Sequence, residues 1–272
     1  MNYLQFDFDI DSAEQSDRLI ALLAMHGFEG FEEKEHWLVA FIAEDQFNES
    51  EFETVIDLFE TLSFSQSLIE NINWNKKWEE GFKPVLVEDF VGIRASFHAP
   101  IAAVQHEIII TPKMSFGTGH HATTYLVMKQ MKEVDFLKKT VLDYGTGTGV
   151  LAILASKLGA EKVLAIDYDE WSIVNAKENI VQNNCAKISV VQADHIDINE
   201  KFDVVLANIN LNVIVYSMPS IAAVTTSGGV ILLSGFLKEN EKVIITSLEA
   251  AGLQYQGIGQ RGDWLIIMAN KL

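Results

Sequence analysis

The sequence of 272 residues contains a single cysteine, Cys185, so the chain cannot form an internal disulfide. Such scarcity is typical of proteins in a reducing compartment, and we expect a cytoplasmic location. Cysteine and histidine do not cluster at the spacing of zinc ligands. We therefore expect no metal site.

Long apolar runs are also missing. No stretch approaches 18 uninterrupted apolar residues, and the first residues lack the basic start and apolar run of a secretion signal. We therefore expect neither a membrane span nor export. The length allows one large domain, or a medium-sized domain together with a small one.

Basic residues are scarce in the first part of the chain. Residues 1–73 hold 17 aspartates and glutamates against only Arg18 and Lys34, so they carry a net charge of −15 of the −18 in the chain. Such a field either keeps a surface solvated or steers a basic partner towards it. Because phosphates are negative as well, we expect no direct binding of nucleic acid there.

A strand, a glycine-rich turn and a helix follow one another in the middle of the chain. The apolar strand 140–144 leads into Gly145-Thr-Gly-Thr-Gly149, and an apolar helix over 150–158 ends at Gly159. This arrangement points backbone N–H groups and a helix N-terminus at a ligand. The next strand ends in Asp167, whose carboxylate suits the two hydroxyls of a ribose. The pattern predicts a site for a nucleoside cofactor.

The spacing of the glycines indicates which cofactor. A dinucleotide fingerprint needs a third glycine at position 150, where Val150 stands. The glycines instead follow Asp143 as D-x-G-x-G-x-G, which resembles the first motif of class I S-adenosylmethionine-dependent methyltransferases. The resemblance implies S-adenosylmethionine as the cofactor, with the acidic residue facing its amino-acid end. The alternative is an ordinary turn between a strand and a helix.

The chain divides into three predicted parts. Residues 1–73 read as β-α-β-β-α-β, the order of the ferredoxin-like split unit, and form a small α+β domain. Residues 74–89 are predicted to be a linker helix, and residues 90–272 form the methyltransferase domain. Within that domain, strands at 90–97 and 107–110 are expected to form a hairpin.

The remaining residues alternate strands and helices and close with a hairpin at 253–258 and 263–269. Together with the class I motif, this predicts an α/β fold with a doubly wound, mostly parallel, seven-stranded sheet. Ligands bind at the carboxyl ends of such strands. Four polar side chains fall at these ends, namely Asp143, Asp167, Asp194 and Asn208.

A loop rich in glycine and hydroxyl groups precedes the helix expected over 125–131. Gly117 and Gly119 flank Thr118, so the loop over 115–124 is a candidate lid over the cofactor. Thr123 or Thr124 is expected to cap the helix that follows.

With these features, the whole chain resembles the PrmA-type methyltransferases, which modify protein eleven of the large ribosomal subunit in bacteria. The resemblance covers the acidic first domain, the connector that ends in Phe82-Lys-Pro84, the Phe116-Gly-Thr-Gly-His-His-Ala-Thr-Thr124 loop, the glycine motif and Ala207-Asn-Ile209. The chain differs from the usual family pattern at three positions. The family usually has threonine, proline and leucine where His120, Ala122 and Asn210 stand.

The resemblance implies that the small domain binds the basic ribosomal protein and the large domain methylates its lysine side chains and terminal α-amine. It further implies cofactor contacts at Thr124, Gly145, Gly147, Asp167 and Asn208, with Asp194 near the adenine. Asn208 is then also the residue that orients the amine, and no general base is assigned. We expect a monomer.

Three other functions are considered. A methyltransferase of RNA or DNA amines has an Asn-Pro-Pro-Tyr-like loop at the same strand end, but Ile209 and Asn210 replace the prolines here. A nicotinamide-dependent oxidoreductase is disfavoured by Val150. A regulator that binds the cofactor without catalysis is disfavoured by Asn208 and the loop before the helix.

Overall fold

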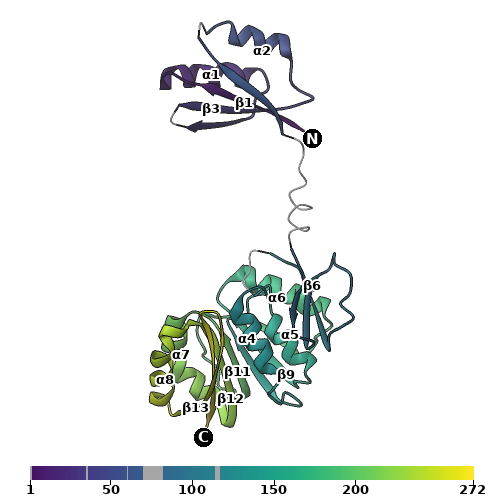
Figure 1. Cartoon of the computed structure of the whole chain (residues 1–272), viewed down its shortest axis with the longest axis vertical. Helices are drawn as coiled ribbons and strands as arrows, with labels where there is room; N and C mark the ends of the chain where they lie inside the picture. Colours follow the sequence, from purple (N-terminus) through teal and green to yellow (C-terminus); the bar gives the residue numbers. More distant parts are fainter. Residues whose placement is uncertain (1, 35, 60, 70–81, 114–116) are drawn as a thin grey trace. The chain divides into compact units, whose positions relative to one another are not determined.

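The computed structural model describes residues 2–34, 36–59, 61–69, 82–113 and 117–272. The chain forms two compact units, Met1–Gly81 and Phe82–Leu272, which are drawn in Figure 1. Residues 74–81 of the predicted linker helix lie outside the described residues.

The first unit is a four-stranded sheet with two helices. Its elements are β1 (Tyr3–Asp9), α1 (Ala13–Met25), β2 (Gly30–Lys34), β3 (Trp37–Ala43), α2 (Glu49–Ile56) and β4 (Phe64–Ile69). The sheet order is β2-β3-β1-β4, and every pairing is antiparallel. This confirms the predicted ferredoxin-like order.

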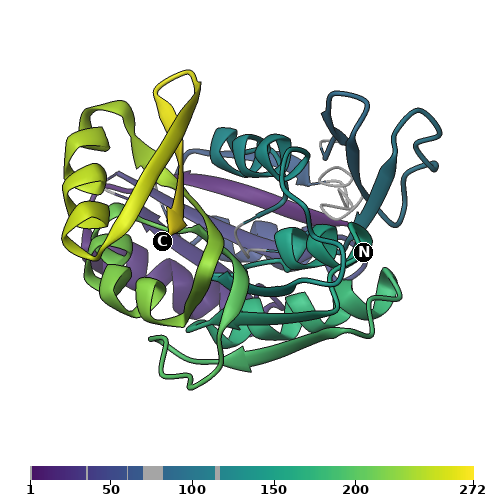
Figure 2. The same ribbon diagram turned by 90° about the horizontal axis from the view of Figure 1, so that it is seen from below.

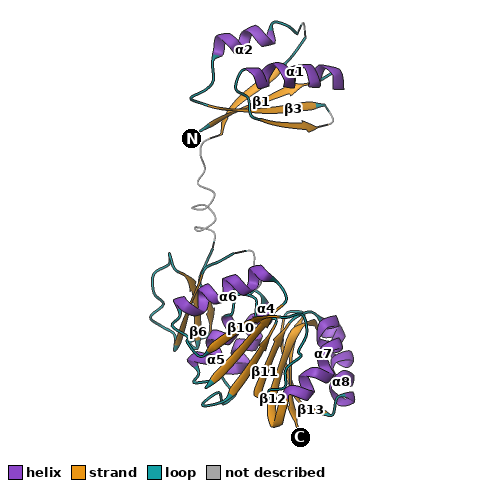
Figure 3. Cartoon of the chain, turned by 180° about the vertical axis from the view of Figure 1, so that it is seen from behind, coloured by secondary structure: helices purple, strands orange, loops and turns teal. Residues whose placement is uncertain are grey.

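One face of this sheet is covered by both helices, as Figure 3 shows. Strand β1 alternates buried and partly exposed side chains, so Phe6 and Phe8 point into the same core. Leu19 and Leu23 of α1 and Phe52 of α2 pack against them. Because all residues of this core come from the first unit, the unit has a hydrophobic core of its own.

The second unit begins with a small three-stranded sheet, β5 (Val85–Val87), β6 (Val91–Ala95) and β7 (His106–Ile110). The predicted linker helix does not extend over Val85–Val87, because their backbone pairs antiparallel with β6. Strands β6 and β7 are parallel, so the predicted hairpin between them is wrong.

The side chain of Arg94 joins β6 to β7 and to the turn that follows β6. Its guanidinium donates to the carbonyls of Ala95 and His98, where the chain turns away after β6. The same group forms a two-point ion pair with the Glu107 carboxylate on β7, with N···O distances of 2.8 and 3.1 Å. Because β7 runs parallel to β6, residues 96–105 return the chain to the end of the sheet at which β6 begins.

The main sheet follows. Its elements are α4 (Ala122–Met131), β8 (Thr140–Tyr144), α5 (Val150–Lys157), β9 (Lys162–Asp167), α6 (Glu170–Gln182), β10 (Ile188–Gln192), β11 (Phe202–Asn208), α7 (Leu211–Val224), β12 (Thr225–Leu237), a short 3-10 helix (Lys238–Asn240), α8 (Glu241–Ala250), β13 (Leu253–Arg261) and β14 (Trp264–Lys271). The strand order is β10-β9-β8-β11-β12-β14-β13. Only β14 runs against the other strands. The predicted seven-stranded, mostly parallel sheet is confirmed.

Helices cover both faces of this sheet. One core contains side chains of α4, α5 and α6, and a separate core contains side chains of α7 and α8. Figure 2 shows the closing hairpin β13–β14 at one end of the sheet, near α8. None of the described helices is long and apolar enough to cross a membrane.

The strand order reverses between β8 and β11. From β8 the chain continues to β9 on one side, and β11 pairs with the other side of β8. At such a switch point the connections leave in opposite directions and open a crevice at the carboxyl ends of the strands. The candidate site lies there.

Candidate active site

The turn after β8 requires glycine for two reasons. Gly145, Gly147 and Gly149 all have positive φ angles, of 78°, 54° and 80°. In addition, a Cβ at Gly145 would lie 2.0 Å from the Ile209 side chain. Close packing between the turn and the end of β11 therefore depends on the missing side chain.

Asp167 fixes this turn from the end of β9. Its Oδ2 accepts a hydrogen bond of 2.8 Å from the N–H of Gly147, and its Oδ1 accepts one of 3.1 Å from the N–H of Asp169. Each carboxylate oxygen has more than one lone pair, so both retain capacity to accept from a ligand. Asp167, which was predicted to accept hydrogen bonds from ribose hydroxyls, is thus held in place by two backbone N–H groups.

Asp143 lies wholly buried beneath the turn and does not line the cavity. Its Oδ2 accepts from the Thr146 hydroxyl at 2.6 Å and from the N–H of Ala152 at 3.1 Å. Burial raises the pKa of this carboxyl to about 6, and the nearby negative charge of Asp167 adds to the effect. The family resemblance implies that this residue faces the cofactor, whereas the structure gives it contacts within the turn.

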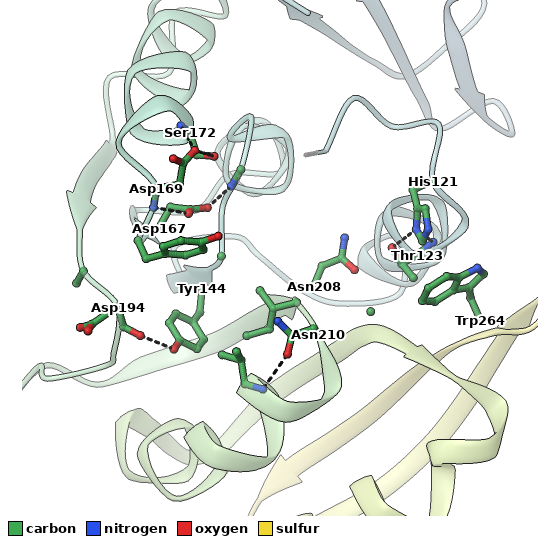
Figure 4. A pocket seen from close by; sticks show the side chains of 17 residues that line it. His121, Thr123, Tyr144, Asp167, Asp169, Ser172, Asp194, Asn208, Asn210 and Trp264 are labelled. Atoms are coloured by element: carbon green, nitrogen blue, oxygen red, sulfur yellow. Dashed lines mark hydrogen bonds between the residues drawn. The ribbon is translucent and has the colours of Figure 1, made fainter. Parts of the chain in front are cut away.

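A cavity of about 660 Å³ opens at the carboxyl ends of β8, β9, β11 and β12 (Figure 4). Its volume is in the range of cofactor and ligand sites. Five of the six predicted site residues line it, namely Gly145, Gly147, Asp167, Asp194 and Asn208.

The sixth, Thr124, lies behind Asn208. The Asn208 side-chain NH₂ donates a hydrogen bond of 3.3 Å to Oγ1 of Thr124, which is fully buried. The Asn208 Oδ1 atom is also buried and has no hydrogen-bond partner among the described residues. A buried acceptor without a donor is costly, by about 1–3 kcal/mol, so a ligand N–H group would be bound favourably there.

Residues after Asn208 are held tightly. The N–H of Ile209 donates to the Ser234 carbonyl at 3.1 Å, and a Cβ at Gly235 would lie only 2.0 Å from the Ile209 carbonyl oxygen. Asn210 caps α7 by accepting from the N–H of Val213 at 3.1 Å. The turn thus has little freedom to move, and its polar groups keep their place at the cavity.

Asp194 lies at the edge of the cavity, with its side chain mostly exposed and paired with His195. This hydrogen bond lowers the pKa of the Asp194 carboxyl. The Tyr144 hydroxyl donates to the Asp194 backbone carbonyl at 3.1 Å and lies 3.2 Å from the Ser217 hydroxyl. Tyr144 therefore joins the end of β8 to the segment after β10.

The opposite wall combines the end of the loop predicted to cover the cofactor with Trp264, which was not predicted from the sequence. It contains His121, Thr123 and Trp264, whose side chains lie together in Figure 4. His121, and not Thr123 or Thr124, caps α4, because its Nδ1 accepts from the Thr123 N–H at 3.4 Å and lies 2.7 Å from the Thr123 hydroxyl. The indole of Trp264 packs edge to face against His121, with ring centroids 4.5 Å apart.

His120 lies away from the cavity. Its Nε2 is 3.0 Å from the Lys83 carbonyl oxygen, and its Nδ1 is 3.1 Å from the Thr118 hydroxyl. Nearby, the Thr148 hydroxyl donates to the Gly117 carbonyl at 2.6 Å and joins this loop to the glycine turn. Residues 115 and 116 of the expected lid lie outside the described residues.

Seven strands in this order, one of them reversed, with a glycine turn at the switch point, define the fold of class I S-adenosylmethionine-dependent methyltransferases. The chain is an enzyme of that class. It belongs to the family described as Ribosomal protein L11 methyltransferase (PrmA), whose model matches residues 10–272.

Individual relatives agree with this assignment. A ribosomal protein L11 methyltransferase from Bacteroides fragilis is 35% identical over 276 residues, covering 98% of this chain and 99% of its own length. One from Chlorobaculum tepidum is 40% identical over 252 residues, covering 88% and 86%. The crystal structure of a ribosomal protein L11 methylase from Lactobacillus delbrueckii subsp. bulgaricus has a TM-score of 0.65 at 28% identity, covering 70% of this chain and all of that one.

Proposed function

We propose that this enzyme transfers methyl groups from S-adenosylmethionine to amines of ribosomal protein L11, at lysine side chains and at the terminal α-amine. The substrate follows from the names of the relatives. One observation in the site supports an amine acceptor. Asn208 lines the cavity, and its buried Oδ1 has no hydrogen-bond donor among the described residues, which an amine N–H would supply.

The residues at the cavity fit the proposed cofactor. Asp167 offers carboxylate oxygens to ribose hydroxyls, and the backbone of Gly145 and Gly147 lines the same cavity. Asp194 would lie near the adenine, and Thr124 would act through the hydrogen bond from Asn208. When bound, S-adenosylmethionine supplies a methyl group that its sulfonium already activates.

The protein's own contribution is to position the amine. A free lysine has a pKa of about 10.4, so its ammonium must lose a proton before the nitrogen can attack. A water-poor cavity favours this loss, because burial disfavours the charged form. The Asn208 Oδ1, with the Ile209 carbonyl, then orients the neutral nitrogen, and alignment supplies most of the acceleration. We assign no general base.

The first unit is proposed to hold the substrate. We take residues 1–73 as the recognition domain and residues 90–272, together with strand β5, as the catalytic domain. Residues 1–73 carry a net charge of −15, which attracts a basic ribosomal protein and repels the phosphates of RNA and DNA. A ribosomal substrate also implies work in the cytoplasm, and we propose a monomer.

Incubation of the purified enzyme with S-adenosylmethionine and unmodified ribosomal protein L11, followed by mass spectrometry, tests this function. We expect methyl groups on L11 amines and none on ribosomal RNA added in parallel. Calorimetric titration should detect binding of S-adenosylmethionine but not of NAD. Methylated RNA together with unmodified L11 would refute the proposed substrate and leave the cofactor standing.

A further inference from the structure

The cavity has two chemically different ends. Figure 4 shows Asn208 between them, with Asp167, Asp169 and Asp194 on one side and Trp264 with its neighbours on the other. The described lining residues at the second end, His121, Thr123 and Trp264, include no carboxylate. A cation that reaches this end therefore meets an aromatic ring instead of an opposite charge.

Trp264 is held in this position from two directions. It begins β14, where its backbone pairs with Leu237 of β12 and with Arg261 of β13. Its indole packs against His121, which the first turn of α4 fixes as its cap. The neighbouring cation, Arg261, stacks over the Tyr125 ring with its guanidinium carbon 3.6 Å from the centroid.

Each transfer in the proposed reaction yields an ammonium cation that carries one more methyl group than before. The amine lone pair forms an N–C bond while the S–C bond of the donor breaks, which leaves a thioether and a methylated ammonium. That ammonium loses a proton to water before the next transfer, and a third transfer leaves a quaternary nitrogen without N–H groups.

Each added methyl group therefore removes one N–H group that could donate a hydrogen bond to the Asn208 Oδ1 atom. Attraction of a cation to an aromatic face needs no N–H group, and tryptophan provides the strongest such site among side chains. As methylation proceeds, recognition by the amide weakens while recognition by an indole persists.

We propose that Trp264 determines how many methyl groups each amine receives, because its indole binds the methylated amine and keeps it in place for a further transfer. This inference rests on the proposed function. It assigns Trp264 as a specificity-determining residue and the His121–Trp264 end as the entrance of the acceptor amine.

The test compares the wild type with Trp264→Leu and Trp264→Phe on ribosomal protein L11, counting methyl groups per amine by mass spectrometry over time. We expect Trp264→Leu to slow the later transfers roughly tenfold relative to the first, so that partly methylated amines accumulate. Trp264→Phe keeps an aromatic face and should give an intermediate distribution. Trp171→Leu is the matched control, because Trp171 is 79% exposed and does not line the cavity.

Binding without turnover provides the second readout. Calorimetry compares unmodified L11 with L11 fully methylated by the wild type, each added to enzyme saturated with S-adenosylhomocysteine. The ratio of the two affinities should fall in Trp264→Leu and less in Trp264→Phe. If the leucine variant does not fold, the phenylalanine variant decides, since it should still reduce this ratio.

Several results would overturn the inference. An unchanged methyl distribution and affinity ratio in the variants, equal slowing of every transfer, or a wild-type product with one methyl group per amine would each do so. Failure of the wild type to methylate L11 at all would instead refute the proposed function. A wild type that adds several methyl groups while the variants match it would refute only the role of Trp264.

Discussion

The side-chain amide of Asn208 donates a hydrogen bond to the hydroxyl of Thr124, 84 residues away in the sequence, over 3.3 Å. Since the NH₂ group is engaged in this way, the Oδ1 atom is the part of the amide that is left to accept from a ligand. The Thr124 hydroxyl therefore orients the group that we propose to position the amine.

Replacement of Thr124 should consequently impair transfer without removing the cofactor site. We expect Thr124→Val to lower kcat/KM about tenfold, because loss of a hydrogen bond worth about 0.5–1.5 kcal/mol lets the Asn208 amide rotate. Steady-state kinetics on ribosomal protein L11 measures the effect. Thr124→Ser retains the hydroxyl and is the matched control, and equal rates for the valine and serine variants would contradict this role.

Asp167 should dominate cofactor affinity. We expect Asp167→Ala to weaken binding of S-adenosylmethionine by more than about 2 kcal/mol, because charged hydrogen bonds to ribose are worth about 1.5–3 kcal/mol each. The substitution also removes the acceptor for the N–H of Gly147. Titration calorimetry should show a smaller loss for Asp167→Asn, which keeps one oxygen. Unchanged affinity in the alanine variant would exclude Asp167 from the site.

Asp143 should make stability depend on pH. Burial raises the pKa of its carboxyl from 3.8 to about 6, so the folded protein binds this proton more tightly than the unfolded chain. The contribution is fully present below about pH 4 and is lost as the pH rises through about 6, with a total of about 3 kcal/mol.

Denaturant unfolding at several pH values checks this dependence. The difference in unfolding free energy between the wild type and Asp143→Asn should shift in favour of the variant as the pH rises from 4 to 6. Asparagine keeps an oxygen for the Thr146 hydroxyl and the Ala152 N–H but cannot ionise. A difference that is independent of pH would show that Asp143 does not titrate in this range.

Removal of the first unit should separate cofactor binding from substrate recognition. Deletion of Met1–Gly81 leaves both cores of the second unit intact, and all the residues proposed to contact the cofactor lie beyond residue 110. We therefore expect unchanged affinity for S-adenosylmethionine and almost no methylation of L11.

Salt provides an independent measurement of the same idea. Activity of the full chain on L11 should decrease as salt is added, because screening limits the reach of the acidic surface to about 8 Å at physiological ionic strength. A truncated enzyme that methylates L11 at the full rate, or activity that is independent of salt, would leave the charge without a role in recognition.

Local chemistry in the sequence was sufficient to predict the cofactor turn. Gly145, Gly147 and Gly149 stand where the chain needs positive φ angles, and this requirement is visible in residue type alone. Periodic apolar residues likewise predicted the order of strands and helices, since each element must bury one face or both. The placement of Asp167 and Asn208 at one edge then follows from parallel strands.

Other features depend on residues that only the tertiary structure brings together. The parallel pairing of β6 and β7 is accompanied by an ion pair between Arg94 and Glu107, and no local pattern specifies either one. The cap of α4 is His121, although the sequence offers two threonines with a higher preference for that position.

The position of Trp264 in the site also depends on the tertiary structure. This tryptophan lies 143 residues after His121 in the sequence. The sequence pattern around it predicts a hairpin of two strands but does not indicate which other strands pair with them. Strand β14 pairs with β12 as well as β13, and this pairing carries the indole to the cavity. The sequence by itself determined the cofactor end, because backbone geometry requires particular residues there. The tertiary structure decided the position of Trp264 at the opposite end, because long-range strand pairing brings it beside His121.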